Sequence, residues 1–239
     1  MKQTQDIWRH EDKYLMHEVE LRALQARLRG LLQPDEHTPE KGFYHISSLY
    51  FDDWENTMLR QNMEGLNQRI KFRIRRYEDG SLFLEEKSRQ NGLIHKEAAQ
   101  LNEAIACRLV KGGLLSFTEA LTPLMRRFAL AQRCQRLRPA AIVDYDRTAW
   151  VSATCNVRIT FDRNVSGSAH VERFLDRAPA VPVFETGRHI LEVKYDGLLP
   201  DYIAMALRTG QMQTSASSKY KFARNAILMP RRKEIGLWI

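Results

Sequence analysis

The sequence predicts an α+β fold in which a mostly antiparallel β-sheet closes, or nearly closes, into a tunnel with a basic lumen and flanking helices. The clearest observation is the stretch 66–77, which alternates cations (Arg69, Lys71, Arg73 and Arg75) with apolar residues (Ile70, Phe72 and Ile74). Successive side chains of a strand point to opposite faces, so this strand has an apolar face and a cationic face. Adjacent cations repel one another, which leaves two interpretations: a solvated outer face, or a surface that meets a polyanion.

The same alternation recurs along the chain, and this recurrence favours the polyanion. The polar faces of the other segments carry Arg9, Glu11 and Lys13; Glu85 and Lys87; Lys96; Tyr145 and Arg147; Arg158; and Glu192 and Lys194. A closed sheet would gather these faces into one lumen. That lumen would be basic, with a few carboxylates able to hold a divalent cation.

Turn and periodicity signals set the order of the elements. Asp79-Gly80 lies between two alternating runs and predicts a hairpin that makes 69–75 and 83–87 antiparallel neighbours. In chain order, the patterns further predict a helix over 17–32, a loop over 33–42, a strand over 44–51, a turn at 90–92, strands over 139–151, 155–161 and 190–195, a helix opened by Pro200 and a last helix over 219–228. The segment 165–180 is predicted to be irregular or weakly stranded.

A helical insert is predicted between the two groups of strands. Asn102 can cap a short helix that ends near Gly112-Gly113. Ser116 and Glu119 have the spacing of a capping box, which predicts a second helix from there to about residue 136.

Composition narrows the class of protein. The chain has 239 residues, 44% of them hydrophobic, which fits one domain over 1–239 with a real core. Its formal net charge of +8 favours anionic partners. The sequence has no run of eighteen apolar residues, so we expect no transmembrane helix. Its N-terminal region lacks the apolar segment of a signal peptide. Three scattered cysteines argue against a disulfide framework or structural zinc site and predict a cytoplasmic location.

Converging arginines and lysines suit a chain of phosphates, because guanidinium groups offer a planar fork of donors and ammonium groups a compact charge. Glu11, Glu85 and Glu192 could hold Mg²⁺ or Mn²⁺, although Glu11 and Glu85 could equally form structural ion pairs. Phosphoryl transfer requires positioning and charge neutralisation more than covalent chemistry. No GxSxG, Walker-type or HExxH motif points to another reaction.

Eight short pieces, in this order and spacing, resemble the VTC (vacuolar transporter chaperone) polyphosphate polymerase domain of the triphosphate tunnel metalloenzymes. They are 9–14 (RHEDKY), 48–52 (SLYFD), 71–75 (KFRIR), 83–87 (FLEEK), 144–149 (DYDRTA), 157–162 (VRITFD), 191–195 (LEVKY) and 217–220 (SSKY). The resemblance implies an antiparallel β-tunnel. It also implies transfer of the terminal phosphate of ATP onto polyphosphate with a divalent metal, Mn²⁺ or Mg²⁺.

The resemblance assigns roles residue by residue. It implies a catalytic set of Lys13, Arg73, Arg75, Lys87, Arg147 and Lys219. It implies a substrate-binding set of Glu11, Lys71, Lys96, Tyr145, Arg158 and Lys194. The metal would be held by Glu192 and Glu85.

Two departures from the family pattern shape the expected activity. Hydrolytic tunnel enzymes begin with ExExK, whereas this chain has Arg9, Glu11 and Lys13 at those positions, which weakens a triphosphatase or cyclase interpretation. Ser215, Ala216 and Ser217 stand where the family often has a basic and an aromatic residue. The chain also lacks the SPX domain and membrane segments of eukaryotic relatives. It resembles a bacterial stand-alone form that works beside a separate membrane protein.

Three functions stay open at this point. The leading one is a polyphosphate-forming phosphotransferase that binds ATP and inorganic polyphosphate. The second is a hydrolase of tripolyphosphate or nucleoside triphosphates. The third is a non-catalytic polyphosphate-binding module. Nucleic acid is not expected as a partner, because the cations alternate with apolar residues on strands instead of lying in an exposed arm with stacking aromatics.

Overall fold

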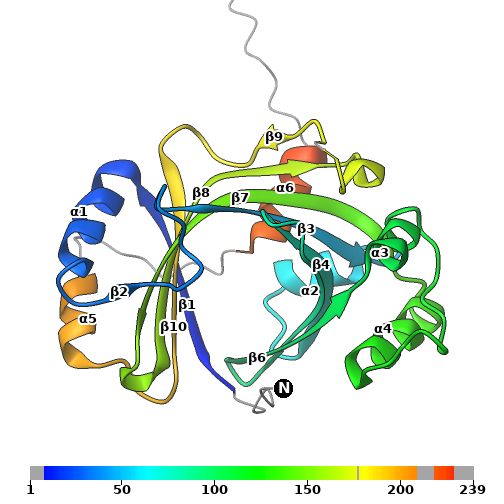
Figure 1. Ribbon diagram of the computed structural model, residues 1–239, viewed down its shortest axis with the longest axis horizontal. Helices are drawn as coiled ribbons and strands as arrows, with labels where there is room; N and C mark the ends of the chain where they lie inside the picture. Colours follow the sequence, from blue (N-terminus) through cyan, green and yellow to red (C-terminus); the bar gives the residue numbers. More distant parts are fainter. Residues whose placement is uncertain (1–7, 177, 209–217, 229–239) are drawn as a thin grey trace, which may run out of the picture.

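The computed structural model describes residues 8–176, 178–208 and 218–228 (Figure 1). Its centre is one antiparallel sheet with the strand order β1-β10-β8-β7-β3-β4-β5-β6, to which the two-residue strands β2 and β9 add at β7 and β8. The strands are β1 (His10–His17), β2 (Gln33–Pro34), β3 (Tyr44–Asp52), β4 (Arg69–Tyr77), β5 (Leu82–Gln90), β6 (Leu93–Leu101), β7 (Arg138–Ser152), β8 (Val157–Ser168), β9 (Val181–Pro182) and β10 (Arg188–Tyr195). The helices are α1 (Glu18–Leu28), α2 (Thr57–Met63), α3 (Glu103–Val110), α4 (Pro123–Cys134), α5 (Asp201–Leu207) and α6 (Lys219–Leu228), with short 3₁₀ turns at Thr154–Asn156 and Val171–Arg173.

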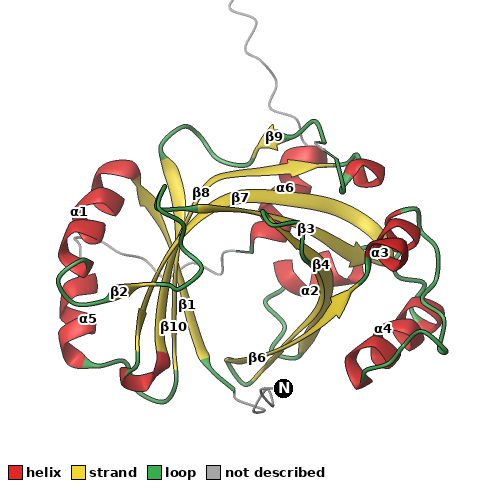
Figure 2. Cartoon of the chain, in the orientation of Figure 1, coloured by secondary structure: helices red, strands yellow, loops and turns green. Residues whose placement is uncertain are grey.

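The sheet curls strongly, so that its first and last strands approach each other (Figure 2). Arg9 and Ile94 exchange two backbone hydrogen bonds of 2.9 Å, which join the start of β1 to the start of β6. The curl gives the sheet a concave face and a convex face. The predicted α+β fold with a tunnel-like antiparallel sheet is confirmed.

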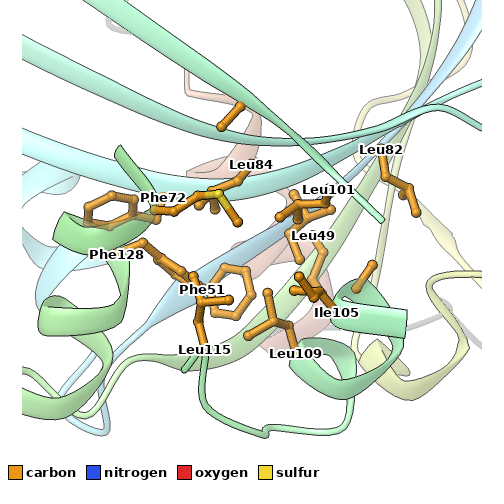
Figure 3. Packing of buried hydrophobic residues seen from close by; sticks show 14 of the residues in the cluster. Leu49, Phe51, Phe72, Leu82, Leu84, Leu101, Ile105, Leu109, Leu115 and Phe128 are labelled. Atoms are coloured by element: carbon orange, nitrogen blue, oxygen red, sulfur yellow. The ribbon is translucent and has the colours of Figure 1, made fainter. Parts of the chain in front are cut away.

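Helices α3 and α4 cover the convex face of β3 to β6. Their apolar sides pack on the strand residues that point away from the cations, including Leu49, Phe72 and Leu84 (Figure 3). Phe128 of α4 meets Phe51 edge-on at 4.9 Å between ring centroids. This packing follows directly from the period-two alternation, which leaves one side of each strand apolar.

Helices α1 and α5 cover the convex face of the other half of the sheet. Leu21, Leu24 and Leu28 of α1 pack with Ile203 of α5 over the apolar sides of β8 and β10. Figure 1 shows the two helix pairs at opposite sides of the curled sheet. The convex face of the sheet is therefore covered by two apolar cores, one under each helix pair.

Helices α2 and α6 close over part of the concave face. Met58, Leu59, Tyr220 and Ala223 pack with residues such as Tyr50 on the inner side of the sheet. A β-carbon added at Gly167 of β8 would lie 2.8 Å from the Ala223 side chain, so glycine permits α6 to lie this close.

Most predicted elements are found, with two corrections. The capping box at Ser116 does not start a helix: α4 begins at Pro123, with the Thr122 hydroxyl accepting from Met125 N at 3.2 Å. Proline has no N–H and fits only the first turn of a helix, so it fixes the start. Helix α2 was not predicted. The predicted turns at 79–80 and 90–92 are both present, with positive φ angles at Gly80, Asn91 and Gly92.

Within the described ranges, no helix has the length and apolar character needed to cross a membrane.

Candidate functional site

The inner side chains of the sheet surround a cavity of about 460 Å³, called the lumen below. All the residues that the sequence singled out as site residues line it, except Glu85, which lies in the wall. Strand register explains the gathering: Lys13 of β1 lies opposite Glu192 of β10, and Arg73 of β4 lies opposite Glu85 of β5. The cavity also reaches Arg69, Arg89, Asn62 and Ser218, which carried no predicted role.

Glu11 is the anionic centre of one group of cations in the lumen. Lys87 Nζ lies 2.6 and 2.7 Å from its two oxygens, Lys13 Nζ lies 2.8 Å from Oε1, and Lys194 Nζ lies 3.6 Å from Oε2. Burial would raise the pKa of the Glu11 carboxyl, but the three lysines hold it well below its ordinary value. Glu11 stays ionised and links β1 with β5 across the lumen.

Asp162 and Glu192 hold a second group. Arg147 donates to the two oxygens of Asp162 at 2.7 and 2.8 Å and to Glu192 Oε2 at 3.3 Å. Lys219, the first residue of α6, has its Nζ 2.6 Å from Asp162 Oδ2 and 3.1 Å from Glu192 Oε1. Burial would lower the pKa of Lys219, but Asp162 and Glu192 raise it above its ordinary value. This group is a compact, fully ionised network.

Glu85 forms the third group, on β5. Its Oε2 accepts from Arg73 Nε at 2.8 Å, while its Oε1 lies 2.8 Å from Lys96 Nζ and 3.5 Å from Arg75 Nη1. Burial would raise the pKa of this carboxyl, but Arg75 and Arg73 hold it well below its ordinary value. The side chain of Glu85 is 1% exposed, so it orients the three cations from behind.

Tyrosines and one aspartate complete the wall. Tyr50 OH accepts from Arg73 Nη1 at 2.8 Å, and the ring of Tyr145 lies 5.1 Å from the Arg147 guanidinium and 5.2 Å from Lys219 Nζ. Arg158 donates to Tyr44 OH at 3.1 Å. It also pairs with Asp35 Oδ2 at 2.9 Å, from the segment after β2.

Three cations of the lumen stand apart, because none forms an ion pair with a described carboxylate. Lys71 of β4 faces Lys87 across the strand pair, and Arg69 faces Arg89. Burial lowers the pKa of Lys71 well below its ordinary value, and Lys13 and Arg69 lower it further. The hydrogen-bond partner of Lys71 Nζ is the Ser218 hydroxyl at 3.3 Å. Cations that lie side by side without a carboxylate repel one another.

Comparison with known proteins identifies the family of this chain. The VTC domain model matches residues 8–228. The chain belongs to the VTC domain family. The predicted membership of the VTC family is therefore confirmed. No match was found among curated proteins.

Solved structures are similar to this VTC domain in fold. One is HpAC1 from Hippeastrum, a putative adenylyl cyclase with a dominant triphosphatase activity, at 14% identity and a TM-score of 0.53, covering 94% of this chain and 98% of that chain. Another is the PH1819 protein from Pyrococcus horikoshii OT3, at 12% identity and a TM-score of 0.49, covering 91% and 98%. At these identities the likeness concerns the tunnel-like fold alone.

The resemblance implied a divalent metal ion, and the donors of the VTC lumen allow a test of fit. No group of three or more His, Cys, Asp or Glu side chains that could hold a metal is found among the described residues. Glu11 and Glu192 nevertheless share Lys13, whose Nζ lies 2.8 and 3.6 Å from them. Two carboxylates fit an ion such as Mg²⁺ or Mn²⁺ that takes its other ligands from substrate phosphates and water. Glu85 fits less well, since its side chain is 1% exposed and lies in the wall, outside the lining of the lumen.

Sequence reasoning gave no role to Asp162 and Asn62. Asp162 ends the stretch 157–162 that carried the resemblance, and it continues the inner face of Arg158 at a period of two. That periodicity was a usable signal. Asn62 is a polar residue on the apolar side of α2, with Met58 and Leu59, which becomes visible only once α2 is known.

Proposed function

We propose that this VTC domain is a polyphosphate polymerase, which transfers the γ-phosphate of ATP onto the end of an inorganic polyphosphate chain inside the lumen. The observation that carries the proposal is the convergence, in one cavity, of cations from β1, β4, β5, β6, β7, β8, β10 and α6. A chain of phosphates is the ligand whose charge and repeat such a lining matches.

The chemistry requires little of the protein beyond charge and alignment. An oxygen of the chain end attacks the γ-phosphorus, a new P–O bond forms, the bond between γ-phosphorus and the bridging oxygen breaks, and ADP leaves. The attacking phosphate oxygen is already ionised at neutral pH, so no general base is needed. Arg73, Arg75, Arg147 and Lys219, held by Glu85, Asp162 and Glu192, are proposed to stabilise the charge on the transferring group.

Glu192 and Glu11 are proposed to hold the divalent ion. When bound, Mg²⁺ or Mn²⁺ would neutralise and orient the triphosphate. Lys13 lies between the two carboxylates and would move toward the phosphate as they take the ion. The remaining residues of the predicted set (Lys71, Lys87, Lys96, Tyr145, Arg158 and Lys194) are proposed to contact the phosphate chain.

The test is incubation of the purified protein with ATP and Mn²⁺, followed by electrophoresis and a polyphosphate stain. A ladder of long chains is the expected product. K219M should abolish the ladder, and R224M, on the same helix and outside the lumen lining, should retain it. Orthophosphate without chains would overturn the polymerase proposal.

A hydrolase is the second candidate, because a protein of the same fold from Hippeastrum has a dominant triphosphatase activity. Hydrolysis needs a base for the attacking water. The lumen carboxylates Glu11, Glu85 and Glu192 all have pKa values held well below the ordinary value by neighbouring cations, which makes them weak bases. This favours a phosphate nucleophile over water. Tight tripolyphosphate binding without turnover would instead support a binding module working with a separate membrane protein.

A further inference from the structure

Helices α2 and α6 run antiparallel and are joined by polar contacts at both ends and in the middle. At one end, Asn62 Nδ2 donates to Ser218 Oγ at 3.2 Å. At the other, Arg224 Nη2 donates to Asn56 Oδ1 at 2.7 Å. Between them, Tyr220 OH donates at 2.7 Å to Asp52, which also accepts from the backbone N–H groups of Met58 and Leu59 in α2.

The Asn62 contact differs from the other two because it faces the lumen. Asn62, Ser218 and Lys71 all line the cavity, and Ser218 Oγ lies within 3.3 Å of both the Asn62 amide and the Lys71 ammonium. The Lys221 backbone N–H also donates to Ser218 Oγ, at 3.4 Å, so three donors share the two lone pairs of this hydroxyl. The Ser218 O–H is left to donate, and no described residue accepts it. Its neighbour in the chain is Lys219.

We propose that Asn62 is a positioning residue for the anion in the lumen: its amide fixes the Ser218 hydroxyl, so that the Ser218 O–H, Lys71 and the first turn of α6 address the same phosphate group. The inference rests on the proposed function only in taking a phosphate chain as the ligand. Asn62 is 4% exposed, and an apolar side chain there would extend the apolar side of α2. The Asp52–Tyr220 and Asn56–Arg224 contacts already join the helices, so Asn62 is free to serve the lumen.

The test is a double-mutant cycle read by calorimetric titration with tripolyphosphate, without metal. Loss of one neutral hydrogen bond predicts that N62A weakens binding about fivefold. Since Asn62 acts through Ser218, N62A should have no further effect in the S218A background. R224M cuts the distant contact of the same helix pair. It should lower Tm while leaving the tripolyphosphate Kd within about twofold, which a purely structural role of the helix contact would not allow.

Unchanged binding by N62A would overturn the inference, as would N62A and S218A effects that multiply in the double variant. If N62A is too unstable to purify, N62S, whose hydroxyl is too short to reach Ser218, takes its place in the cycle. Because the readout is binding, the two proposals separate. A wild-type protein that binds tripolyphosphate and makes no chains would refute the polymerase proposal. The double-mutant cycle would still decide whether Asn62 positions the anion. A wild-type protein that does not bind tripolyphosphate would refute both.

Discussion

Two groups of cations in the lumen are held in opposite ways. On β7 and α6, Arg147 and Lys219 are each bound to both Asp162 and Glu192. On β4 and β5, where other cations pair with Glu85 and Glu11, Lys71 and the facing pair Arg69 and Arg89 make no ion pair with described carboxylates. We call Arg147 and Lys219 with their two carboxylates the paired side, and Lys71, Arg69 and Arg89 the unpaired side.

The contrast separates two tasks that basic residues perform in one cavity. Buried cations that share carboxylates are fixed in place before any ligand arrives, which suits the stabilisation of charge on a transferring group. Cations without a carboxylate partner lack a counterion, and a bound polyanion would supply one. Binding is then favoured because the polyanion relieves the repulsion among these cations. The paired side should thus govern stability and rate, and the unpaired side should govern affinity.

The largest expected effect comes from the paired side. D162N removes a fully buried carboxylate and leaves Arg147 and Lys219 sharing Glu192. Breaking a buried ion network of this kind costs about 3 kcal/mol, or roughly 9 °C in Tm for a chain of this size. Thermal unfolding measures the loss. Tripolyphosphate should restore more of the Tm in D162N than it adds to the wild type, because it supplies the missing negative charge.

The matched control is D196N, which cuts the part-exposed Arg9–Asp196 pair at 2.8 Å. That pair lies at the rim, where ion pairs contribute less than about 1 kcal/mol. If D196N and D162N lost the same stability, burial of the paired side would not be what fixes its cations.

The alternation of residues was enough to predict which side chains face the lumen. Strand side chains have a period of two, so Arg73, Glu85, Tyr145 and Glu192 could be assigned to one face without knowing their neighbours. The contacts between strands could not be predicted in the same way. Glu11 and Lys87 are 76 positions apart and meet only because the sheet curls until β1 joins β6.

Helix α2 escaped prediction for a related reason. It has seven residues, and the N–H groups of Met58 and Leu59 in its first turn are accepted by Asp52, which belongs to the preceding strand and looks like a strand-end residue in sequence. A helix that depends on a tertiary cap and on packing with α6 has little local signal. Without α2, neither Asn62 nor its contact with Ser218 could be foreseen.

An intermediate effect of opposite sign is expected on the unpaired side. K71M removes a cation that lies opposite Lys87 and beside Arg69 on β4 without a carboxylate partner. It should therefore raise the free energy of unfolding by about 1 kcal/mol, or Tm by about 3 °C. The same variant should weaken tripolyphosphate binding at least about tenfold, because a charged donor is lost. K96M is the control: Lys96 pairs with Glu85 at 2.8 Å, so its removal should not raise Tm. A fall in Tm for K71M would show that Lys71 is compensated after all.

The smallest expected effect is a pH dependence of stability and of ATP affinity. Burial lowers the pKa of Lys194 from its ordinary 10.5 to about 8, although Glu192 and Glu11 oppose the shift. An unfolded chain therefore binds more protons than the folded one between pH 8 and 10.5, so Lys194 makes the ligand-free protein more stable as pH rises through that window. A bound anion favours the protonated lysine, so binding should take up protons and ATP affinity should fall above pH 8. The phosphates of ATP titrate near pH 6, so they stay fully ionised above pH 8 and add nothing to this pH dependence.

Calorimetric titration with ATP at pH 8, in two buffers of different ionisation enthalpy, counts these protons. Lys194 alone should contribute about half a proton, and Lys71, whose pKa is lowered further by burial and by Lys13, should add to it. Lys219 should contribute none, because its raised pKa keeps it protonated with or without ligand. K71M should then lower the proton uptake, while a conservative change at Arg147 or Lys219 should leave it constant. Binding without proton uptake at pH 8 would mean that Lys194 and Lys71 are already protonated in the ligand-free protein. The lumen would then bind anions with charges that it carries before binding, and no charge would be acquired on binding.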